Sequence, residues 1–305
     1  MEFLYLLEKI RLPGLNEFML TITHLGEETA FLVIALIVFW CVDKYQGHYL
    51  MGVGLSGTLI SQFMKILCQI PRPWVRDPNF HALEDAIGEA GGYSFPSGHT
   101  QSAVGTFGAL AYTRKETWLR IVCLVLAVLV GFSRMYVGVH TPADVLVGAA
   151  ISVALIFAQK PFMLGKGQKY IPVVYAVMLA LSVAYTLYVE LYPFPADVDA
   201  DNYASALKNA YTLLGTVSGL LLVYFVDEKK LQFQTKAVWW AQILKVILGL
   251  GAVLLVKEGL RAPLEALFAG HLAARSVRYF LIVLVAGVVW PLTFRWFAKL
   301  GEKGK

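Results

Sequence analysis

Long apolar stretches recur along almost the whole chain of 305 residues, and they constrain its fold more than any other feature. Each is roughly 17–25 residues long, the length that a helix needs to cross the hydrocarbon core of a bilayer. Hydrophobic residues make up 58% of the chain, well above the usage of soluble domains. The sequence therefore predicts an all-α fold, a polytopic transmembrane helical bundle.

About nine spans are expected from the apolar pattern, the third of them short. They cover residues 26–43, 48–70, 100–114, 119–139, 142–159, 171–192, 205–226, 237–256 and 277–297. The N-terminal residues mix acids with apolar side chains and lack a basic start and a small-residue cleavage site. We therefore expect a short interfacial helix there and no removable signal peptide.

Basic residues divide unequally between the two sides that these spans imply. Most Lys and Arg lie in the connections at residues 44–47, 114–120, 160–170, 227–236 and 295–305. By the positive-inside rule that side, with the C-terminus, is expected to be cytoplasmic. The same distribution explains the net charge of +5 without a nucleic-acid partner.

One polar, proline-containing run, YPFPADVDADNY at residues 192–203, interrupts the apolar pattern. Such runs are typical of boundaries between structural units. We therefore predict one domain over residues 1–192 and a second, accessory domain over residues 193–305. Within the second, Lys245 lies inside an apolar stretch. An ionisable residue there indicates a binding partner or cavity, or alternatively pairing for packing alone.

The first polar cluster is KILCQIPRP at residues 65–73. Lys65 and Arg72 are seven residues apart, so two helical turns would place them on nearly the same face before the prolines end the helix. Two cations directed at one point are suited to binding an anion. The alternative is that both side chains extend from a helix end towards the membrane interface.

The second cluster is FPSGHT at residues 95–100, directly before an apolar helix. Ser97 is placed as the N-cap, and Gly98 lets a ligand approach the backbone. The free N–H groups of the first turn favour a phosphate. Alone, the cluster is also compatible with an ordinary capped helix whose His99 has no chemical role.

The third cluster is SRMYVGVHTPAD at residues 133–144. His140 and Asp144 are four residues apart, so a carboxylate can orient one ring nitrogen and leave the other free to attack. Thr141 and Pro142 are equally typical of a helix start without catalytic meaning. All three clusters fall on the expected non-cytoplasmic face, and this conjunction favours a common site.

In the same order, the three clusters resemble the signature motifs of the type 2 phosphatidic acid phosphatase superfamily. The resemblance covers about residues 26–192 and implies a six-helix core, to which the accessory domain adds about three transmembrane helices. It also implies a metal-independent phosphatase without a cofactor. His140 would attack phosphorus, Asp144 would orient His140, and His99 would protonate the leaving oxygen. The phosphate-binding residues would be Lys65, Arg72, Ser97, Gly98 and Arg134.

The loop at residues 74–95 holds scattered acids and aromatic residues. The acids fit a solvated loop better than a magnesium site, and the aromatic residues fit either substrate contact or the interfacial belt. No metal is therefore assigned.

The expected substrate is a lipid phosphate, because motifs at headgroup level let the lipid chain stay among the membrane lipids. The candidates are a polyprenyl diphosphate, phosphatidylglycerol phosphate, phosphatidate and a sphingoid phosphate. Three alternatives remain open: a sugar phosphatase resembling glucose-6-phosphatase, a lipid phosphotransferase, and a nonenzymatic lipid transporter.

Overall fold

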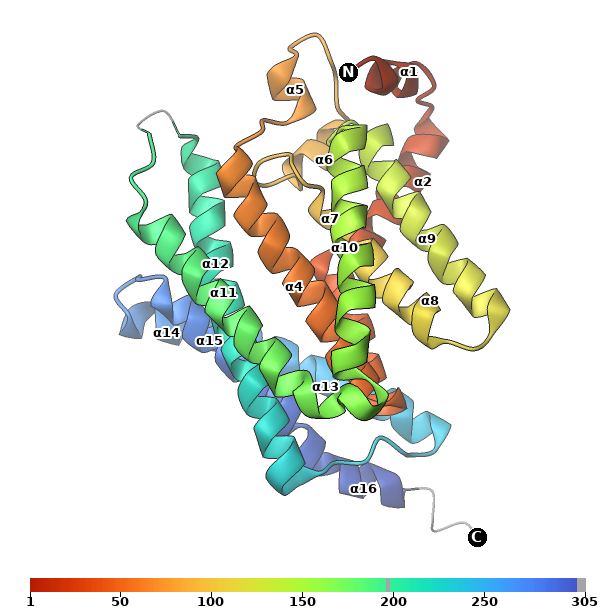
Figure 1. The fold of residues 1–305 in the computed structure, drawn as a ribbon, viewed down its shortest axis with the longest axis vertical. Coiled ribbons are helices and arrows are strands. Elements are labelled where there is room, and N and C mark those ends of the chain that lie inside the picture. The colour runs from red at the N-terminus through yellow and green to blue at the C-terminus, as the bar shows by residue number, and fades with distance from the viewer. Residues whose placement is uncertain (196–197, 301–305) are drawn as a thin grey trace. The chain divides into compact units, whose positions relative to one another are not determined.

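A computed structural model describes residues 1–195 and 198–300, and the regular elements in these residues are all helical (Figure 1). Residues 196–197 of the polar boundary run and the C-terminal residues 301–305, expected to be cytoplasmic, lie outside the described residues. Within the described residues, seven helical segments are long and apolar enough to span a membrane: Lys44–Arg76, Thr117–Tyr136, Pro142–Met163, Gly165–Leu191, Ala200–Leu231, Trp239–Leu267 and Ala273–Lys299.

An eighth span is obtained if two helices bent by 54°, Pro13–Gly26 and Glu28–Val42, are counted together. Three of these spans follow residue 192, as predicted for the C-terminal region, and the described residues give fewer than nine by length because one expected span is short. The expected span at 100–114 is present as a helix, but its sixteen residues from Gly98 to Thr113 rise only about 24 Å. That is less than the roughly 30 Å thickness of the hydrocarbon core.

The described chain divides into two compact units that do not follow the sequence order. The first comprises Met1–Ile34, Leu50–Gln159 and Pro193–Ala206, and the second comprises Ala35–Tyr49, Lys160–Tyr192 and Leu207–Lys305. The division at residue 192 into a core and an accessory domain stays a prediction.

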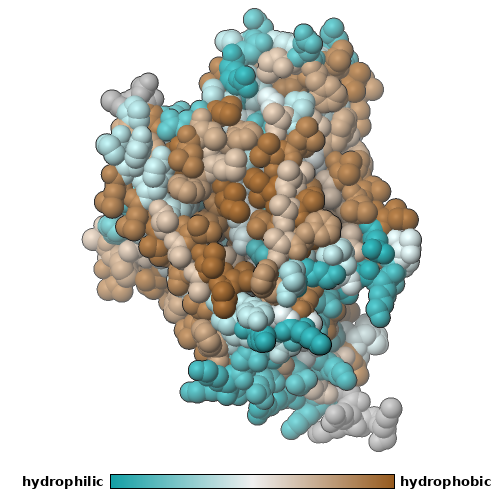
Figure 2. Space-filling model, viewed as in Figure 1, coloured by the Kyte–Doolittle hydropathy of each residue, from teal (hydrophilic) through white to brown (hydrophobic). Residues whose placement is uncertain are grey.

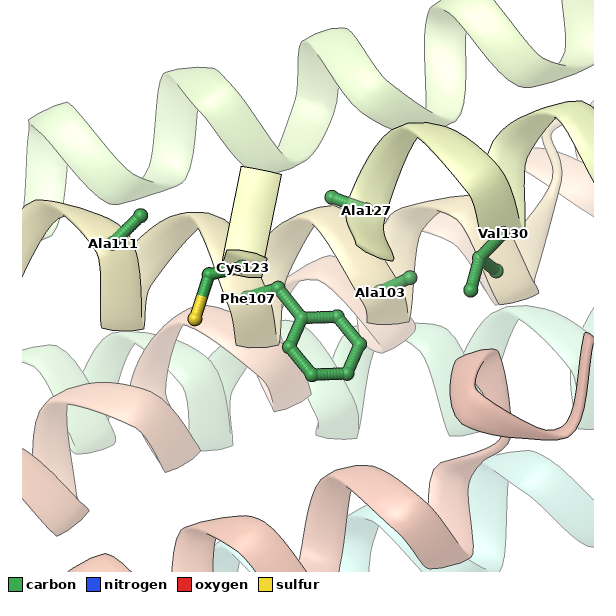
Figure 3. Close-up of a cluster of buried hydrophobic side chains, with 6 residues drawn as sticks. All are labelled: Ala103, Phe107, Ala111, Cys123, Ala127 and Val130. Atoms are coloured by element: carbon green, nitrogen blue, oxygen red, sulfur yellow. The ribbon is translucent and has the colours of Figure 1, made fainter. Parts of the chain in front are cut away.

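The first unit is built around helix α9 (Thr117–Tyr136), which packs against several shorter helices. A π-helical turn, η3 (Val104–Gly108), joins two of these, α7 (Gly98–Ala103) and α8 (Ala109–Thr113). Figure 3 shows the small side chains that let α9 approach this broken helix; the buried cluster comprises Ala103, Phe107, Ala111, Cys123, Ala127 and Val130. The remaining helices with residues in this unit are α1 (Glu2–Lys9), α2 (Pro13–Thr23), η1 (His24–Gly26), α3 (Glu28–Ile37), α4 (Lys44–Cys68), α5 (Pro73–Arg76), α6 (Glu84–Gly88), α10 (Pro142–Met163) and the start of α12 (Ala200–Val226).

The loop between α4 and α7 is held by packing and by the N-terminal helices. Phe80 is buried and meets the ring of Tyr5 edge-on, with centroids 5.5 Å apart. Tyr5 also donates a hydrogen bond of 2.8 Å to Asp77, and Tyr93 is buried. These aromatic side chains of the loop therefore pack inside the protein, unlike members of an interfacial belt.

The second unit contains one helical turn from the N-terminal region and most of the helices after residue 160. They are η2 (Val38–Val42), η4 (Gly165–Tyr170), α11 (Ile171–Leu191), α12 (Ala200–Val226), η5 (Asp227–Leu231), α13 (Trp239–Gly259), α14 (Arg261–Leu267), α15 (Ala273–Leu284), η6 (Val285–Val289), η7 (Pro291–Thr293) and α16 (Phe294–Lys299). Lys245 on α13 is fully buried and donates to the carbonyl of Thr235 at 2.9 Å. Its ammonium lies 4.4 Å from the centroid of the Phe294 ring, so this lysine is paired within the unit.

Large hydrophobic side chains remain exposed on the long helices of both units. Among them are Trp118, Val128, Leu146, Trp239 and Leu255. Figure 2 shows hydrophobic residues over much of the visible face. Soluble monomers rarely expose so much contiguous apolar surface, whereas lipid chains solvate it. The protein is a multi-pass integral membrane protein.

Candidate active site

The three polar clusters of the sequence come together in the first unit. The loop before α7 links them: Ser94 donates to Asp144 at 2.7 Å, and Arg72 donates to Gly92 at 3.0 Å. The backbone N–H of Ser97 also donates to the carbonyl of Asp144 at 3.0 Å. Residues from three separate segments thus form one buried site.

The first cluster does not lie on one helix face, so that part of the prediction is wrong. Helix α4 ends at Cys68, and Gln69 follows in the left-handed region with φ of 48°. Arg72 therefore stands in extended backbone ahead of α5, where a proline begins the next turn. The side chains of Lys65 and Arg72 converge nevertheless, because both reach the carbonyl groups of residues 91–94.

Both cations of the first cluster are buried and bonded to main-chain oxygen atoms. Lys65 donates to the carbonyl of Tyr93, and Arg72 donates to Gly91, Gly92 and Val139 at 2.8–3.1 Å. A side chain that extends to the interface would place its charge in water, and neither does so.

Arg134 approaches the site from the last turn of α9 and is fully buried. Its Nη1 donates to the hydroxyl of Thr23 at 2.7 Å, while its Nε has no hydrogen-bond partner among the described residues. A buried, partly unpaired guanidinium is costly unless an anion completes its bonds.

The second cluster forms the start of α7 as expected. Ser97 is the N-cap, and its hydroxyl accepts from the N–H and the hydroxyl of Thr100 at 3.4 and 2.9 Å. A side chain built at Gly98 would meet open space, so a ligand can approach this turn. The Nε2 atom of His99 is buried and has no hydrogen-bond partner in the described part of the chain.

The third cluster places His140 and Asp144 side by side, both buried. The Nδ1 atom of His140 lies 3.5 Å from Asp144 Oδ2, longer than an ordinary hydrogen bond. The same oxygen accepts from the hydroxyl of Ser94 and the N–H of Thr141, each at 2.7 Å. On the other side of the ring, Arg72 donates to Nε2 at 2.9 Å, which assigns the ring proton to Nδ1, facing Asp144.

The electrostatic environment keeps both histidines neutral. Burial, followed by Arg72, Lys65 and Arg134, lowers the pKa of His140 well below its ordinary value near 6.5. Burial, and then Arg134, Arg72 and Lys65, lowers the pKa of His99 in the same direction. At neutral pH both imidazoles therefore retain a lone pair.

Two further residues of the site were not found in the sequence. Ser94 holds the carboxylate of Asp144, and Thr23 holds the guanidinium of Arg134 across 111 positions of the chain. Ser94 stands directly before the second cluster, a weak signal, but nothing in the sequence marks Thr23. One group of described donors, His24, Glu27 and Glu89, has the spacing of a metal site.

Comparison with protein families finds a match in each half of the chain, and both matches are to PAP2 families. The PAP2 superfamily matches residues 46–168, and the family described as PAP2 superfamily phosphatase, transmembrane extension, matches residues 211–303. No solved structure matches significantly.

Three relatives illustrate the similarity. Phosphatidylglycerophosphatase B of Bacillus subtilis is 33% identical over 164 residues, which are 50% of this chain and 77% of the relative. Undecaprenyl-diphosphatase BcrC of the same organism is 31% identical over 129 residues, 41% of this chain and 63% of the relative. Human sphingosine-1-phosphate phosphatase 2 is 27% identical over 143 residues, 45% and 35% of the two chains. The chain belongs to the PAP2 superfamily and is a membrane phosphatase.

Proposed function

We propose that the protein removes a phosphate group from a membrane lipid phosphate, with His140 as the nucleophile and no metal in the chemistry. The charge of the site carries this proposal. Lys65, Arg72 and Arg134 are buried together, and Asp144 is the carboxylate buried with them. Three positive charges and one negative charge leave a surplus that a phosphate dianion would neutralise.

The reaction follows from the positions of the two histidines. A bound phosphate competes for the guanidinium of Arg72, which frees Nε2 of His140 to form a bond to phosphorus while Asp144 stabilises the proton on Nδ1. The bond between this phosphorus and the oxygen that joins it to the rest of the lipid breaks. His99 donates its proton to the departing oxygen.

The negative phosphate is also what allows His99 to act as an acid. Its pKa is lowered by burial and by nearby cations, and a dianion between them reverses the electrostatic part of that effect. Water then attacks the phosphohistidine, His99 accepts a proton from the water, and inorganic phosphate and His140 are released.

The relatives named above favour a lipid as the substrate, since their names refer to phosphatidylglycerophosphate, undecaprenyl diphosphate and sphingosine 1-phosphate. The exposed apolar side chains of the long helices support the same class, because a lipid chain would stay among them while its phosphate enters the site. The substrate is therefore proposed to be a polyprenyl diphosphate, phosphatidylglycerol phosphate, phosphatidate or sphingoid phosphate.

The test is phosphate release by the purified protein in detergent with EDTA, from these lipids and from glucose 6-phosphate. His140→Ala is expected to lower the rate by at least about a thousandfold. His81→Ala, at an exposed histidine, is the matched control. Substrate labelled on phosphorus should leave acid-labile label on the wild type and none on His140→Ala. Unchanged turnover in the variant would exclude the nucleophile, and a strict need for metal would exclude the metal-free chemistry.

The site is proposed to face away from the cytoplasm, on the strength of the Lys and Arg distribution. A cysteine introduced at exposed Asp85 should react with an impermeant maleimide in intact cells. Reaction only after the cytoplasmic side is opened would reverse the orientation.

A further inference from the structure

Three ionisable side chains with no role in the proposed reaction converge beside the phosphate site. His24 belongs to η1, Glu27 follows that turn, and Glu89 follows α6 more than sixty positions later. His24 Nδ1 lies 2.5 Å from Glu27 Oε1 and 4.0 Å from Glu89 Oε2. One donor atom from each residue lies within 4.8 Å of the other two.

The backbone that carries His24 and Glu27 is packed on the active site. Thr23, which immediately precedes His24, accepts the hydrogen bond of Arg134. A Cβ atom at Gly26 would lie 2.9 Å from the carbonyl oxygen of His99, so this turn contacts His99 closely. His24 also contributes to the lowered pKa of His99, after burial and the three cations. The group is thus electrostatically coupled to the phosphate site.

Fold stability does not account for the group. Its side chains are between 37% and 51% exposed, and ion pairs at such exposure stabilise a protein by only about 0–1 kcal/mol. Two carboxylates at one point repel each other. The turn also lies at the 54° break between two apolar helices, Pro13–Gly26 and Glu28–Val42.

We propose that His24, Glu27 and Glu89 bind one divalent transition-metal cation at the edge of the phosphate site. One imidazole nitrogen and two carboxylate oxygens are three protein ligands, which leave a coordination position open to water or substrate. This mixed set suits Zn²⁺ or Mn²⁺, whereas Mg²⁺ and Ca²⁺ prefer oxygen alone. His24 and Glu27 exchange their hydrogen bond for metal bonds, a small movement for partly exposed side chains.

The cation acts on binding and takes no part in the chemistry of His140. It adds positive charge next to His99 and Arg134, where it attracts the second anionic group of a substrate such as a lipid diphosphate. We therefore expect it to lower KM for a diphosphate and to leave kcat unchanged. This consequence rests on the proposed function, whereas the existence of the site does not.

The site is tested on the full-length protein, purified in detergent and freed of metal. The protein is titrated with Mn²⁺, and free Mn²⁺ is measured by its electron paramagnetic resonance signal. The wild type is expected to bind one equivalent, displaced by Zn²⁺. Glu89→Gln and His24→Ala should each weaken binding at least tenfold. Glu84→Gln, an exposed acid of the same loop, is the matched control. Wild type without stoichiometric binding, or Glu89→Gln that binds as the wild type does, would overturn the proposal.

Two further measurements separate this inference from the proposed function. His140→Ala should bind Mn²⁺ as tightly as the wild type, because its defect is chemical. In the wild type, Mn²⁺ should lower KM for a lipid diphosphate several-fold, and in Glu89→Gln this response should disappear while kcat is retained. A response that persists in Glu89→Gln would place the cation elsewhere.

Discussion

Two buried charge clusters, one in each unit, are balanced differently. In the second unit, Lys44 and Asp227 lie 2.6 Å apart, and Asp227 also accepts from the N–H of Phe233 at 3.1 Å. In the first unit, three cations share one carboxylate, and nitrogen atoms of His99 and Arg134 lack partners among the described residues. One cluster is complete by itself, and the other is complete only with an anion.

The charge balance of a buried cluster distinguishes a structural role from a functional one better than the burial or the type of its residues does. Lys245 and Lys65 are both buried lysines in apolar helices and have the same signature in the sequence. Both ammonium groups donate to main-chain carbonyls, but Lys245 also lies beside an aromatic ring, whereas Lys65 is buried in the same site as Arg72 and Arg134. A buried charge alone does not indicate a ligand. An excess of buried positive charge over negative charge indicates that an anion binds there.

Removing a partner from the balanced cluster should have the largest effect on stability. Lys44→Met leaves Asp227 buried without its cation and should destabilise the fold by about 3–5 kcal/mol, while each folded molecule retains its activity. Thermal unfolding in detergent, with kcat per folded molecule, measures both. Lys230→Met, at an exposed lysine of the same turn, should be neutral. An equal loss of stability in the two variants would mean that the Lys44–Asp227 ion pair does not stabilise the fold more than an exposed lysine does.

Removing a cation from the unbalanced cluster should lower the activity without lowering the stability of the fold. Arg134→Met is expected to lower kcat/KM by about 10²–10³, roughly 2.7–4 kcal/mol of transition-state stabilisation. The melting temperature should not fall, because repulsion with Arg72 is relieved. Arg76→Met, at an exposed arginine, should retain activity. A large loss of stability in Arg134→Met would show that the two clusters differ less than we infer.

Ser94 is expected to act through Asp144. Ser94→Ala removes one hydrogen bond to the carboxylate, worth about 1.5 kcal/mol, and should lower kcat roughly tenfold with KM unchanged. Ser94→Thr, which keeps a hydroxyl, should restore part of the rate. Ser102→Ala, at another buried serine of this unit, serves as the control. If KM rises and kcat does not fall, Ser94 binds substrate instead.

The surplus of positive charge should also appear in the pH dependence. As the proposed nucleophile, His140 has to be neutral to attack, and its pKa is held below 6.5, so the acidic limb of kcat/KM should lie below pH 6.5. Lys65→Met removes one of the cations responsible, and the limb should move towards neutral pH. The profile should be measured with several substrates whose phosphates differ in their second pKa. A limb that stays at the same pH with all of them reports an ionisation of the enzyme and not of the substrate. A limb that does not move in Lys65→Met would argue against this coupling.

Much of the fold and site was accessible from the sequence, because membrane helices and helix ends obey local rules. The helices and the eight proposed site residues were identified from apolar length and from short motifs. What failed depended on backbone detail. The turn at Gln69 removed Arg72 from the helix, and the helix Pro13–Thr23 before the first predicted span was not expected as part of a bent pair.

Contacts between distant segments were not predictable by these rules. The bond from Arg134 to Thr23 joins α9 and α2, two helices that are far apart in the chain. The grouping of His24 and Glu27 with Glu89 likewise requires the loop to fold back. Periodicity constrains which face of a helix is buried, but it does not specify which neighbour covers that face.

If His140 is the nucleophile, as we propose, its bond to Arg72 would make the arginine, and not the histidine, the source of chemical selectivity. The guanidinium already donates to three carbonyl groups and to Nε2. Only a group that offers several strong acceptor oxygens can replace the imidazole as its partner and so expose the reactive nitrogen. An uncharged carboxylic ester cannot do this. Nitrophenyl phosphate should therefore be cleaved while nitrophenyl acetate is left intact, and equal cleavage of both would show that the imidazole is freely accessible.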